Sequence, residues 1–289
     1  MKVLVTGASH PLAQSLIDSL RTQGHELFLV GPRSGLRAGQ GILVQEDILN
    51  LHHVDSKIDQ IYHLDLDCDE LHPVEAMLKN SLGTINVLRL AYVKRARSVI
   101  GIDYAMICGK GEMASAAASS IAFIEALSAS YAREKGVDVR VARFYCVYGS
   151  SYGWLYEALK SMLAGEDLSV EGDEVFPVHV GDAVSGLMKL MEYEGSEMPG
   201  RAVDFMGQKI GREELLKTAR KMLGSSSKIS QEKAKPSSHR PDPRFAYENL
   251  QWLPTIELQQ GISRLVERVK KSGESRQRVE KAQRPNNKL

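Results

Sequence analysis

The stretch MKVLVTGASHPLAQSLIDSL, Met1 to Leu20, decides the fold. Its first part, Lys2 to Val5, is a short apolar run, which predicts a buried β-strand. A turn at Gly7 follows, and apolar side chains then recur at the spacing of an amphipathic helix, at Leu12, Leu16 and Leu20. A strand that passes through a glycine turn into a helix is the first unit of a parallel α/β sheet.

The same turn predicts a site for a phosphate group. Backbone N–H groups and the positive end of a helix meet a pyrophosphate at such a turn, and three glycines let the phosphates come close. Here only Gly7 is present, whereas His10 and Ala13 stand at the second and third glycine positions. Pro11 also removes one N–H donor at the helix start. We therefore expect a nucleotide-binding scaffold whose phosphate site is weakened.

Strand and helix patterns alternate over the first half of the chain. Apolar runs predict strands at 26–30, 42–45, 58–64, 98–102 and 137–144, and longer periodic segments predict helices at 73–93 and 113–135. This alternation predicts a doubly wound, parallel, Rossmann-type α/β sheet over residues 1–150.

The elements become shorter after residue 150. Patterns at 154–163, 181–193, 212–223 and 256–269 predict helices, and 168–170 predicts a strand. We expect a smaller C-terminal α/β lobe over residues 151–270, interleaved with the first domain. The Ser- and Lys-rich segment 225–238 is predicted to be a mobile connection, and residues 271–289 a basic, disordered tail.

Composition favours a cytoplasmic protein. The chain has 289 residues, 43% of them hydrophobic, and a net charge of +1. No run has the roughly 18–20 apolar residues of a membrane span, and the start does not resemble a signal peptide. Three widely spaced cysteines suit a reducing compartment. From Arg264 onward nine Lys or Arg stand against three Glu, but the tail has no aromatic residues, so nucleic-acid binding is not expected.

The residues that follow the second and fourth predicted strands indicate which cofactor or metal the chain could bind. Dinucleotide-binding folds often end the second strand with an acid, but Val30 and Gly31 stand there. Arg33 is a candidate for a 2′-phosphate of NADP, or simply a solvated loop residue. The segment HLDLDCDELH, residues 63–72, gathers acids and two histidines without the spacing of a metal site, so no metal is expected. These acids would repel phosphates nearby.

Several phrases together resemble a known family. They are VLVTGA, QEDI, IYHL, NSLGTINVLRLA, VRVARFYCVYG, VHVGDAVSGLMKLM, RPD, LQWLP and LQQGI. In this order they resemble the extended short-chain dehydrogenase/reductases, the NAD-dependent epimerase/dehydratase group that acts on nucleotide sugars, and most of all its UDP-glucuronate decarboxylases. The resemblance covers nearly the whole chain and implies the Rossmann fold, a bound NAD or NADP and a dimer through the helices around 73–95 and 113–135.

The catalytic positions implied by the resemblance are altered. The family's Tyr-x-x-x-Lys pair corresponds to Ala117 and Ile121, which can neither transfer a proton nor hold a nicotinamide ribose. The family's Ser or Thr after the fifth strand corresponds to Tyr104. Tyr104 is a candidate for a displaced acid or base, and a buried tyrosine with a structural hydrogen bond is the alternative.

Of the other positions implied by the resemblance, some match the family and others do not. The family's substrate-binding Asn corresponds to Cys146, and Arg240 is a candidate phosphate contact, with His239 as an equal candidate. Asp47 matches the acid that holds the adenine amino group, and Asn80 matches the family pattern. The family's loop over the substrate is reduced to KGEMASA, residues 110–116, so a lid is not expected.

Three functions follow as hypotheses. The first is a non-catalytic family member, a structural or regulatory subunit that pairs with itself or with an active relative and retains at most weakened binding of NAD, NADP or a nucleotide sugar. The second is an NAD(P)-dependent nucleotide-sugar enzyme with a rebuilt site that uses Tyr104 or His10 with nearby acids. The third, nucleic-acid binding through the basic tail, has the least support. Because the framework is kept while the reactive residues are replaced, we favour the first.

Overall fold

A seven-stranded parallel sheet forms the centre of the molecule. The computed structural model describes every residue except 53, 67–71, 105–115, 172–173, 233–240 and 284–289. The strand order is β11-β6-β5-β4-β1-β2-β3, and every neighbouring pair runs parallel. The strands are β1 (Lys2–Thr6), β2 (Glu26–Val30), β3 (Ile42–Gln45), β4 (Gln60–His63), β5 (Arg97–Asp103), β6 (Val139–Phe144) and β11 (Ala202–Phe205). The predicted doubly wound Rossmann-type sheet is therefore confirmed.

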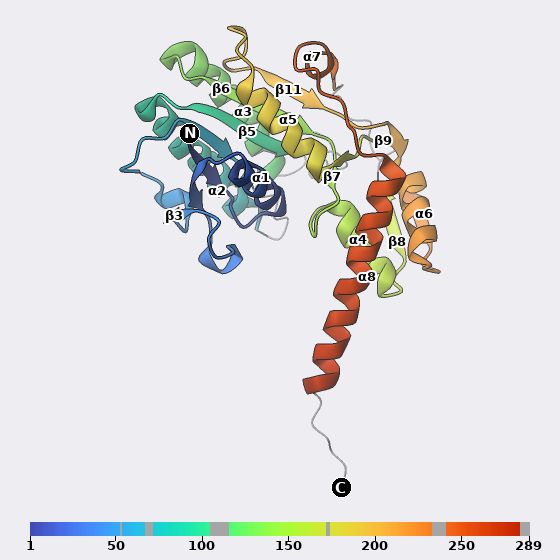
Figure 1. The fold of residues 1–289 in the computed structure, drawn as a ribbon. Helices are drawn as coiled ribbons and strands as arrows, with labels where there is room; N and C mark the ends of the chain where they lie inside the picture. The colour runs from blue at the N-terminus through green and yellow to red at the C-terminus, as the bar shows by residue number, and fades with distance from the viewer. Residues whose placement is uncertain (53, 67–71, 105–115, 172–173, 233–240, 284–289) are drawn as a thin grey trace.

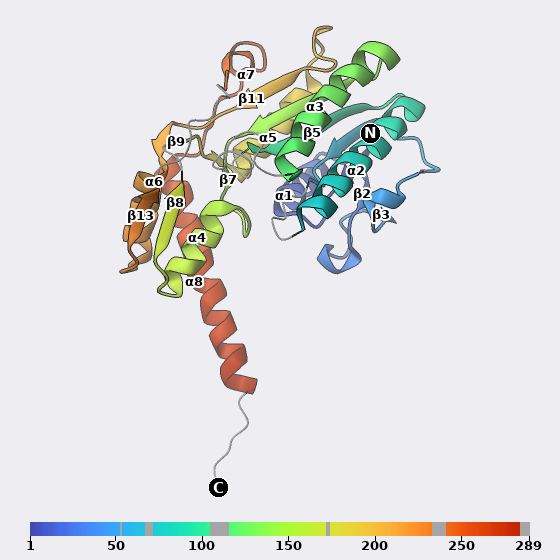
Figure 2. The ribbon, with the colours of Figure 1, turned by 180° about the vertical axis from the view of Figure 1, so that it is seen from behind.

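Helices cover both faces of this sheet. The helices α1 (Pro11–Thr22) and α5 (Val180–Glu192) lie on one face (Figure 1), and α2 (Pro73–Lys94) and α3 (Ala116–Lys135) lie on the other (Figure 2). Alternate residues of β1 serve the two layers, because successive strand side chains point to opposite faces. Val3 and Val5 pack with α1 and α5, whereas Leu4 packs with α2.

A smaller group of elements follows the sheet in the chain. It contains α4 (Trp154–Leu163), α6 (Arg212–Leu223) and the first turns of α8 (Leu258–Gln283), packed beside the paired strands β8 (Leu168–Glu171) and β13 (Ile229–Glu232). Their buried side chains form a core of their own, including Leu155, Leu159, Leu216, Leu265 and Val266. The remaining short elements are β7 (Val147–Tyr148), β9 (Glu174–Val175), β10 (Val178–His179), β12 (Ile210–Gly211), α7 (Arg244–Glu248), η1 (Arg33–Gly35) and η2 (Ile48–Asn50).

The edge strand β11 was not predicted, and two segments that were predicted to be mobile or disordered contain regular structure. The segment 225–238 contains β13, because its backbone pairs with β8 and needs no apolar side chains to do so. The last helix continues to Gln283, into the predicted disordered tail. The residues after Val269 are mostly Lys, Arg, Glu and Gln, which are strong helix formers, so a helix can continue there without burying a face.

Trp252 anchors the segment that leads into α8. Its ring is 1% exposed, and its Nε1 donates to the backbone oxygen of Asp182 over 3.0 Å. The Asp182 carboxylate in turn accepts from the backbone N–H and the hydroxyl of Thr255. No helix in the described part of the chain combines the length and apolar character that a bilayer crossing requires.

Candidate functional site

The ends of β1, β4 and β5 meet at the carboxyl edge of the sheet. In open parallel α/β sheets, ligands bind at this edge, where neighbouring strands lead to helices on opposite faces. Here β1 leads to α1 on one face and its neighbour β4 leads to α2 on the other, so the candidate site is the space between the two turns. We call this space the crevice. Residues from five segments line it, namely His10, Leu12, Leu64, Leu66, Gly101, Ile102, Asp103, Ile121, Val147 and Tyr152.

His10 closes the phosphate end of the crevice. It is the N-cap of α1, and its Nδ1 accepts from the N–H of Leu12 over 3.3 Å. The Tyr152 ring meets the imidazole edge to face, with 4.2 Å between ring centroids. Burial lowers the pKa of His10 to about 4, so the ring is neutral at pH 7. A neutral side chain therefore caps the helix end that an anion would otherwise occupy.

The remaining free volume of the crevice is small. The cavity measures about 40 Å³, whereas pockets for small-molecule ligands and cofactors are about 300–1,000 Å³. A cavity of this size holds one or a few water molecules. Among the described residues, the crevice is therefore filled by the protein's own side chains.

The glycine-rich loop after β2 folds back on the same turn. A Cβ on Gly35 would lie 2.3 Å from the Cβ of Ser9, so only glycine allows this approach. Gln40 is buried and donates to Gln14 of α1 over 2.6 Å, which ties the loop to the helix. The loop thus covers the turn from the β2 side.

Gly7 keeps the role that the sequence predicts for the turn itself. It has φ +66, and a Cβ there would lie 2.7 Å from the backbone oxygen of Leu64. Ala13, at the third glycine position, is fully buried in the core between α1 and the sheet. Close packing between the turn and β4 is thus retained, although the phosphate site is not open.

The two positions to which the resemblance assigns the catalytic pair lie in α3. Ala117 is in the first turn of that helix. Ile121 is buried and lines the crevice with an apolar side chain. No ionisable group of the described residues stands at the place where the resemblance puts a lysine.

Tyr104 belongs to a polar cluster between β5, α3 and β6. Its phenol donates to Glu125 over 2.6 Å, and Glu125 also accepts from the Arg143 guanidinium, with 2.7 Å to Nε. Arg143 in addition pairs with Asp204, which accepts from the Tyr145 hydroxyl over 2.7 Å. Burial and the Glu125 charge raise the pKa of Tyr104 above its ordinary value. That shift is opposite to the one that a catalytic phenolate needs.

His63 and Asp65 face different partners. His63 is fully buried, with Nδ1 2.7 Å from the Thr6 hydroxyl and Nε2 3.0 Å from the Thr84 hydroxyl. Burial lowers its pKa to about 3, so it is a neutral bridge between β1, β4 and α2. Asp65 pairs with Lys79 over 2.9 Å. The other acids of the predicted cluster fall at 67–71, outside the described residues, and His72 is the N-cap of α2.

Cys146 lies at a strained point beside the crevice. Its φ is +106, a region that favours glycine. Its N–H donates to the Asp103 carboxylate over 3.0 Å, and the N–H of Val147 donates to the same carboxylate over 2.9 Å. The buried thiol packs in the core of the smaller lobe. The candidate substrate position is thus a core position in this chain.

The other predicted site residues lie apart from the crevice. Arg33 is exposed and pairs with Glu46 over 3.3 Å. Asp47 is the N-cap of η2 and accepts from the N–H of Leu49. Asn80 is buried and donates to the Ser120 hydroxyl over 3.0 Å, joining α2 to α3. Arg240 and the shortened lid lie outside the described residues.

Sequence reasoning did not find Tyr152 or Asp103. Tyr152 stands in a loop far along the chain from His10, and no motif marks it. Asp103 directly follows the predicted strand 98–102 as an ordinary polar residue, yet its carboxylate holds the turn at Cys146. A carboxylate directly after a buried strand is the one available signal, and it does not name its partner.

Comparison with known proteins gives related sequences. No family model matches the chain. UDP-glucuronic acid decarboxylase 1 of Xenopus tropicalis is 24% identical over 303 residues, which cover 92% of this chain and 71% of that protein. UDP-glucuronic acid decarboxylase 6 of Arabidopsis thaliana is 26% identical over 305 residues, which cover 91% and 87%.

Comparison of structures gives the same fold. UDP-glucose 4-epimerase of Thermotoga maritima, solved with UDP-glucose, has a TM-score of 0.79 at 19% identity and covers 94% of this chain and 99% of its own. UDP-glucuronic acid 4-epimerase of Bacillus cereus, solved with UDP-glucuronic acid and NAD, has the same TM-score and identity, with 94% and 100% covered.

Proposed function

We propose that this chain is a non-catalytic member of the extended short-chain dehydrogenase/reductase family of nucleotide-sugar epimerases, dehydratases and decarboxylases, and that it serves as a structural or regulatory subunit. The observation that carries this proposal is the filled crevice, where His10 and Tyr152 leave about 40 Å³. The cytoplasm is the compartment that we propose, in line with the composition.

The reactive groups support the same proposal. With Ala117 and Ile121 at the catalytic positions, no phenol or ammonium stands there to move a proton or to hold a ribose. Tyr104 has the right functional group, but its hydroxyl donates a hydrogen bond to Glu125, and Tyr104 is not among the residues that line the crevice.

The residues do not fit a dinucleotide in the arrangement described. A pyrophosphate needs free N–H groups at the start of α1, but the His10 imidazole accepts from one of them and Pro11 supplies none. Ile121 and Tyr152 take up the space beyond the helix start. Binding of NAD, NADP or a nucleotide sugar would require these side chains to move, so we propose that it is weak.

Isothermal titration calorimetry tests this proposal directly. We expect NAD to bind the purified chain with a Kd weaker than about 1 mM, and we expect no decarboxylation or epimerisation of UDP-glucuronic acid. The double substitution His10→Gly and Tyr152→Ala empties the phosphate end while keeping a residue type that is acceptable at an N-cap, so it should bind NAD more tightly. Micromolar binding by the unaltered chain, together with turnover, would reject the proposal.

The alternative is an enzyme with a rebuilt site. Its support is that Tyr104, Glu125 and Arg143 form a connected proton-carrying cluster beside β5 and β6. If this cluster acts on a nucleotide sugar, Tyr104→Phe abolishes a measurable activity while the thermal unfolding midpoint stays within a few degrees. Full activity of that variant removes Tyr104 from any mechanism.

The outer face of α2 and α3 is the surface that we propose for a partner. Val74, Leu78 and Leu82 recur every four residues along α2 and are each about half exposed, and Phe123 of α3 is 43% exposed. Residues four apart share one side of a helix, so the α2 side chains form an apolar stripe next to α3. Such a stripe suits a second copy of this chain or an active relative.

A further inference from the structure

A second hollow lies at the opposite edge of the sheet from the crevice. It has a volume of about 550 Å³ and lies where α2 and α3 end and β5 and β6 begin. We call it the rear hollow. Its lining residues are Ala91, Tyr92, Val93, Arg95, Ala96, Lys135, Gly136, Val137 and Asp138. This volume is within the range of small-molecule sites, about 300–1,000 Å³.

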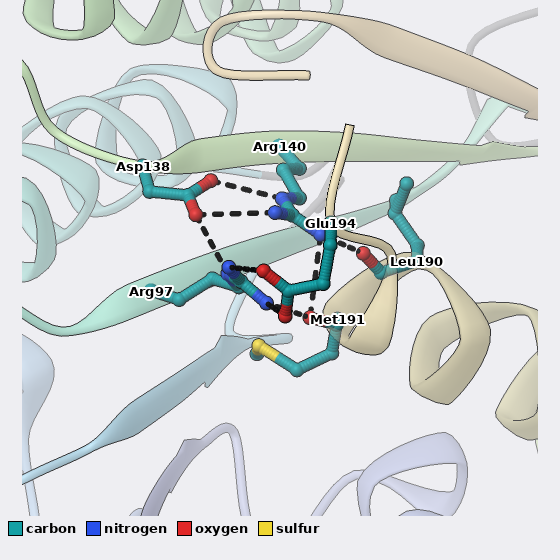
Figure 3. A network of polar contacts seen from close by, with 6 residues as sticks. All are labelled: Arg97, Asp138, Arg140, Leu190, Met191 and Glu194. Atoms are coloured by element: carbon teal, nitrogen blue, oxygen red, sulfur yellow. Dashed lines mark hydrogen bonds and ion pairs between the residues drawn. The ribbon is translucent and has the colours of Figure 1, made fainter. Parts of the chain in front are cut away.

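Two cations of the rear hollow, Arg95 and Lys135, have no counter-charge among the residues that the structure describes. Among the described residues, no carboxylate lies within ion-pair distance of Arg95 or Lys135. The nearby acid Asp138 is already occupied, since its carboxylate pairs with Arg97 over 2.6 Å and with Arg140 over 2.9 Å (Figure 3). The positive charge of Arg95 and Lys135 is therefore available to an anion from solution.

The Arg95 backbone adds an independent observation. Arg95 is the C-cap of α2 with φ 53 and ψ 39, a left-handed conformation that usually belongs to glycine or asparagine. An arginine at this position keeps a cation at the rim of the hollow in spite of the unfavourable backbone. The helix dipole favours a cation at this end, and the exposed guanidinium is still free to meet an anion from solution.

Apart from Asp138, which is paired with Arg97 and Arg140, the remaining side chains of the lining are apolar or aromatic. The Tyr92 side chain is exposed at the rim beside Val93, and the buried Ala91, Ala96 and Val137 form the floor. An inorganic anion gains nothing from these groups. A ligand that carries a flat ring can stack on the Tyr92 face and cover the apolar floor while its anionic group lies between the two cations.

We infer that the rear hollow binds a nucleoside monophosphate, with the phosphate between Arg95 and Lys135 and the base against Tyr92. This site is separate from the crevice, and it does not depend on whether the crevice binds a dinucleotide. In a regulatory subunit it would act as an effector site at the shared end of α2 and α3.

Calorimetric titration of the full chain with AMP tests the inference, with adenosine and inorganic phosphate as partial ligands. AMP should bind more tightly than either part, and its affinity should fall as the salt concentration rises, because the two cations are exposed. Arg95→Asn keeps a residue that tolerates the left-handed backbone. Together with Lys135→Gln, it should lower AMP affinity by about tenfold or more.

Matched variants test whether AMP binds in the rear hollow and which part of AMP is recognised there. Arg89→Gln removes an exposed cation on the same helix outside the hollow and should leave AMP affinity unchanged. Tyr92→Ala should lower the affinity for AMP but not for phosphate. An unchanged AMP affinity in the Arg95→Asn, Lys135→Gln chain, or equal affinities for AMP and phosphate, would overturn the inference. AMP binding that appears only after His10→Gly and Tyr152→Ala belongs to the crevice, and that result counts against the rear hollow alone.

Discussion

At the start of α1, one imidazole takes the place of a bound anion. A glycine at that position leaves the helix N–H groups open to a phosphate, whereas His10 satisfies one of them and meets the Tyr152 ring edge to face. The chain thus keeps the strand, the turn and the helix of a nucleotide-binding unit and changes only what the helix end contacts.

The titration of His10 gives a pH prediction. Burial lowers its folded pKa to about 4 from 6.5, so the unfolded chain binds the additional proton between these values. Stability from this residue is therefore full above pH 6.5 and is lost as the pH falls toward 4. Relative to His10→Asn, which keeps a cap but does not titrate, the unaltered chain should lose about 2 kcal/mol more between pH 7 and pH 5. Urea unfolding at the two pH values measures the difference, and parallel losses in both chains would contradict it.

Gly7 and Gly24 form a matched pair for a second prediction. Both have a left-handed backbone, at φ +66 and +79, but a Cβ on Gly7 would meet the Leu64 backbone whereas Gly24 has open space around it. Gly24→Ala should cost about 1 kcal/mol from the backbone alone. Gly7→Ala should cost at least about 2 kcal/mol more, because β1 and β4 must separate. Equal free energies of unfolding for the two variants would show that the turn is not tightly packed.

At the scale of the element, the buried Arg140 and the partly exposed Arg97 hold the end of α5 to the sheet. Arg140 is 1% exposed and donates to the backbone oxygens of Leu190 and Met191, and Arg97 also donates to Met191 (Figure 3). These carbonyl groups are among the last of the helix and lack helical partners. Positive charge at a helix C-terminus is also favourable.

Replacing Arg140 should therefore be costly. Arg140→Ala removes the buried donors for two helix-end carbonyls and one partner of the partly exposed Asp138, so we expect a loss of about 3–5 kcal/mol in the free energy of unfolding. Arg133→Ala, at an exposed arginine paired with Glu134, should change it by less than about 0.5 kcal/mol. Guanidinium titrations of the two variants give the comparison; similar values would mean that water replaces Arg140 without penalty.

Most elements could be predicted because their signals are local. The strands 26–30 and 42–45 and the helices 154–163 and 212–223 have the predicted bounds, since apolar spacing and flanking glycines mark them. β13 could not be predicted in this way, because its residues are polar and its stability comes from pairing with β8. The predicted last helix is shorter than α8, because a charged sequence without apolar spacing predicts disorder even where its residues favour a helix.

The parts of the site that depend on contacts between distant segments could not be predicted from the sequence. The turn at Gly7 was predicted from a few adjacent residues. The closing partner Tyr152 was not, because only the folded chain brings it to His10. The pairing of Tyr104 with Glu125 is likewise a product of packing between β5 and α3.

At the scale of the whole molecule, the outer face of α2 and α3 predicts self-association. Leu78→Glu and Leu82→Glu place charges in the apolar stripe and should convert a dimer to a 32.0 kDa monomer in sedimentation velocity. Ile42→Glu, at an exposed apolar residue on the edge strand β3, should leave the dimer intact. A monomer for the unaltered chain over the whole concentration range would contradict a homodimer through this face.

The last helix has a geometric consequence for anything attached to the carboxyl end. Buried side chains fix α8 through Val269, and the backbone then runs on as a helix to Gln283, away from the rest of the chain (Figure 1). At 1.5 Å per residue, this extension reaches about 20 Å beyond its last anchor. A protein fused at this end would therefore be held by a semi-rigid helical spacer, at a defined distance and direction from the sheet, and not by a flexible linker.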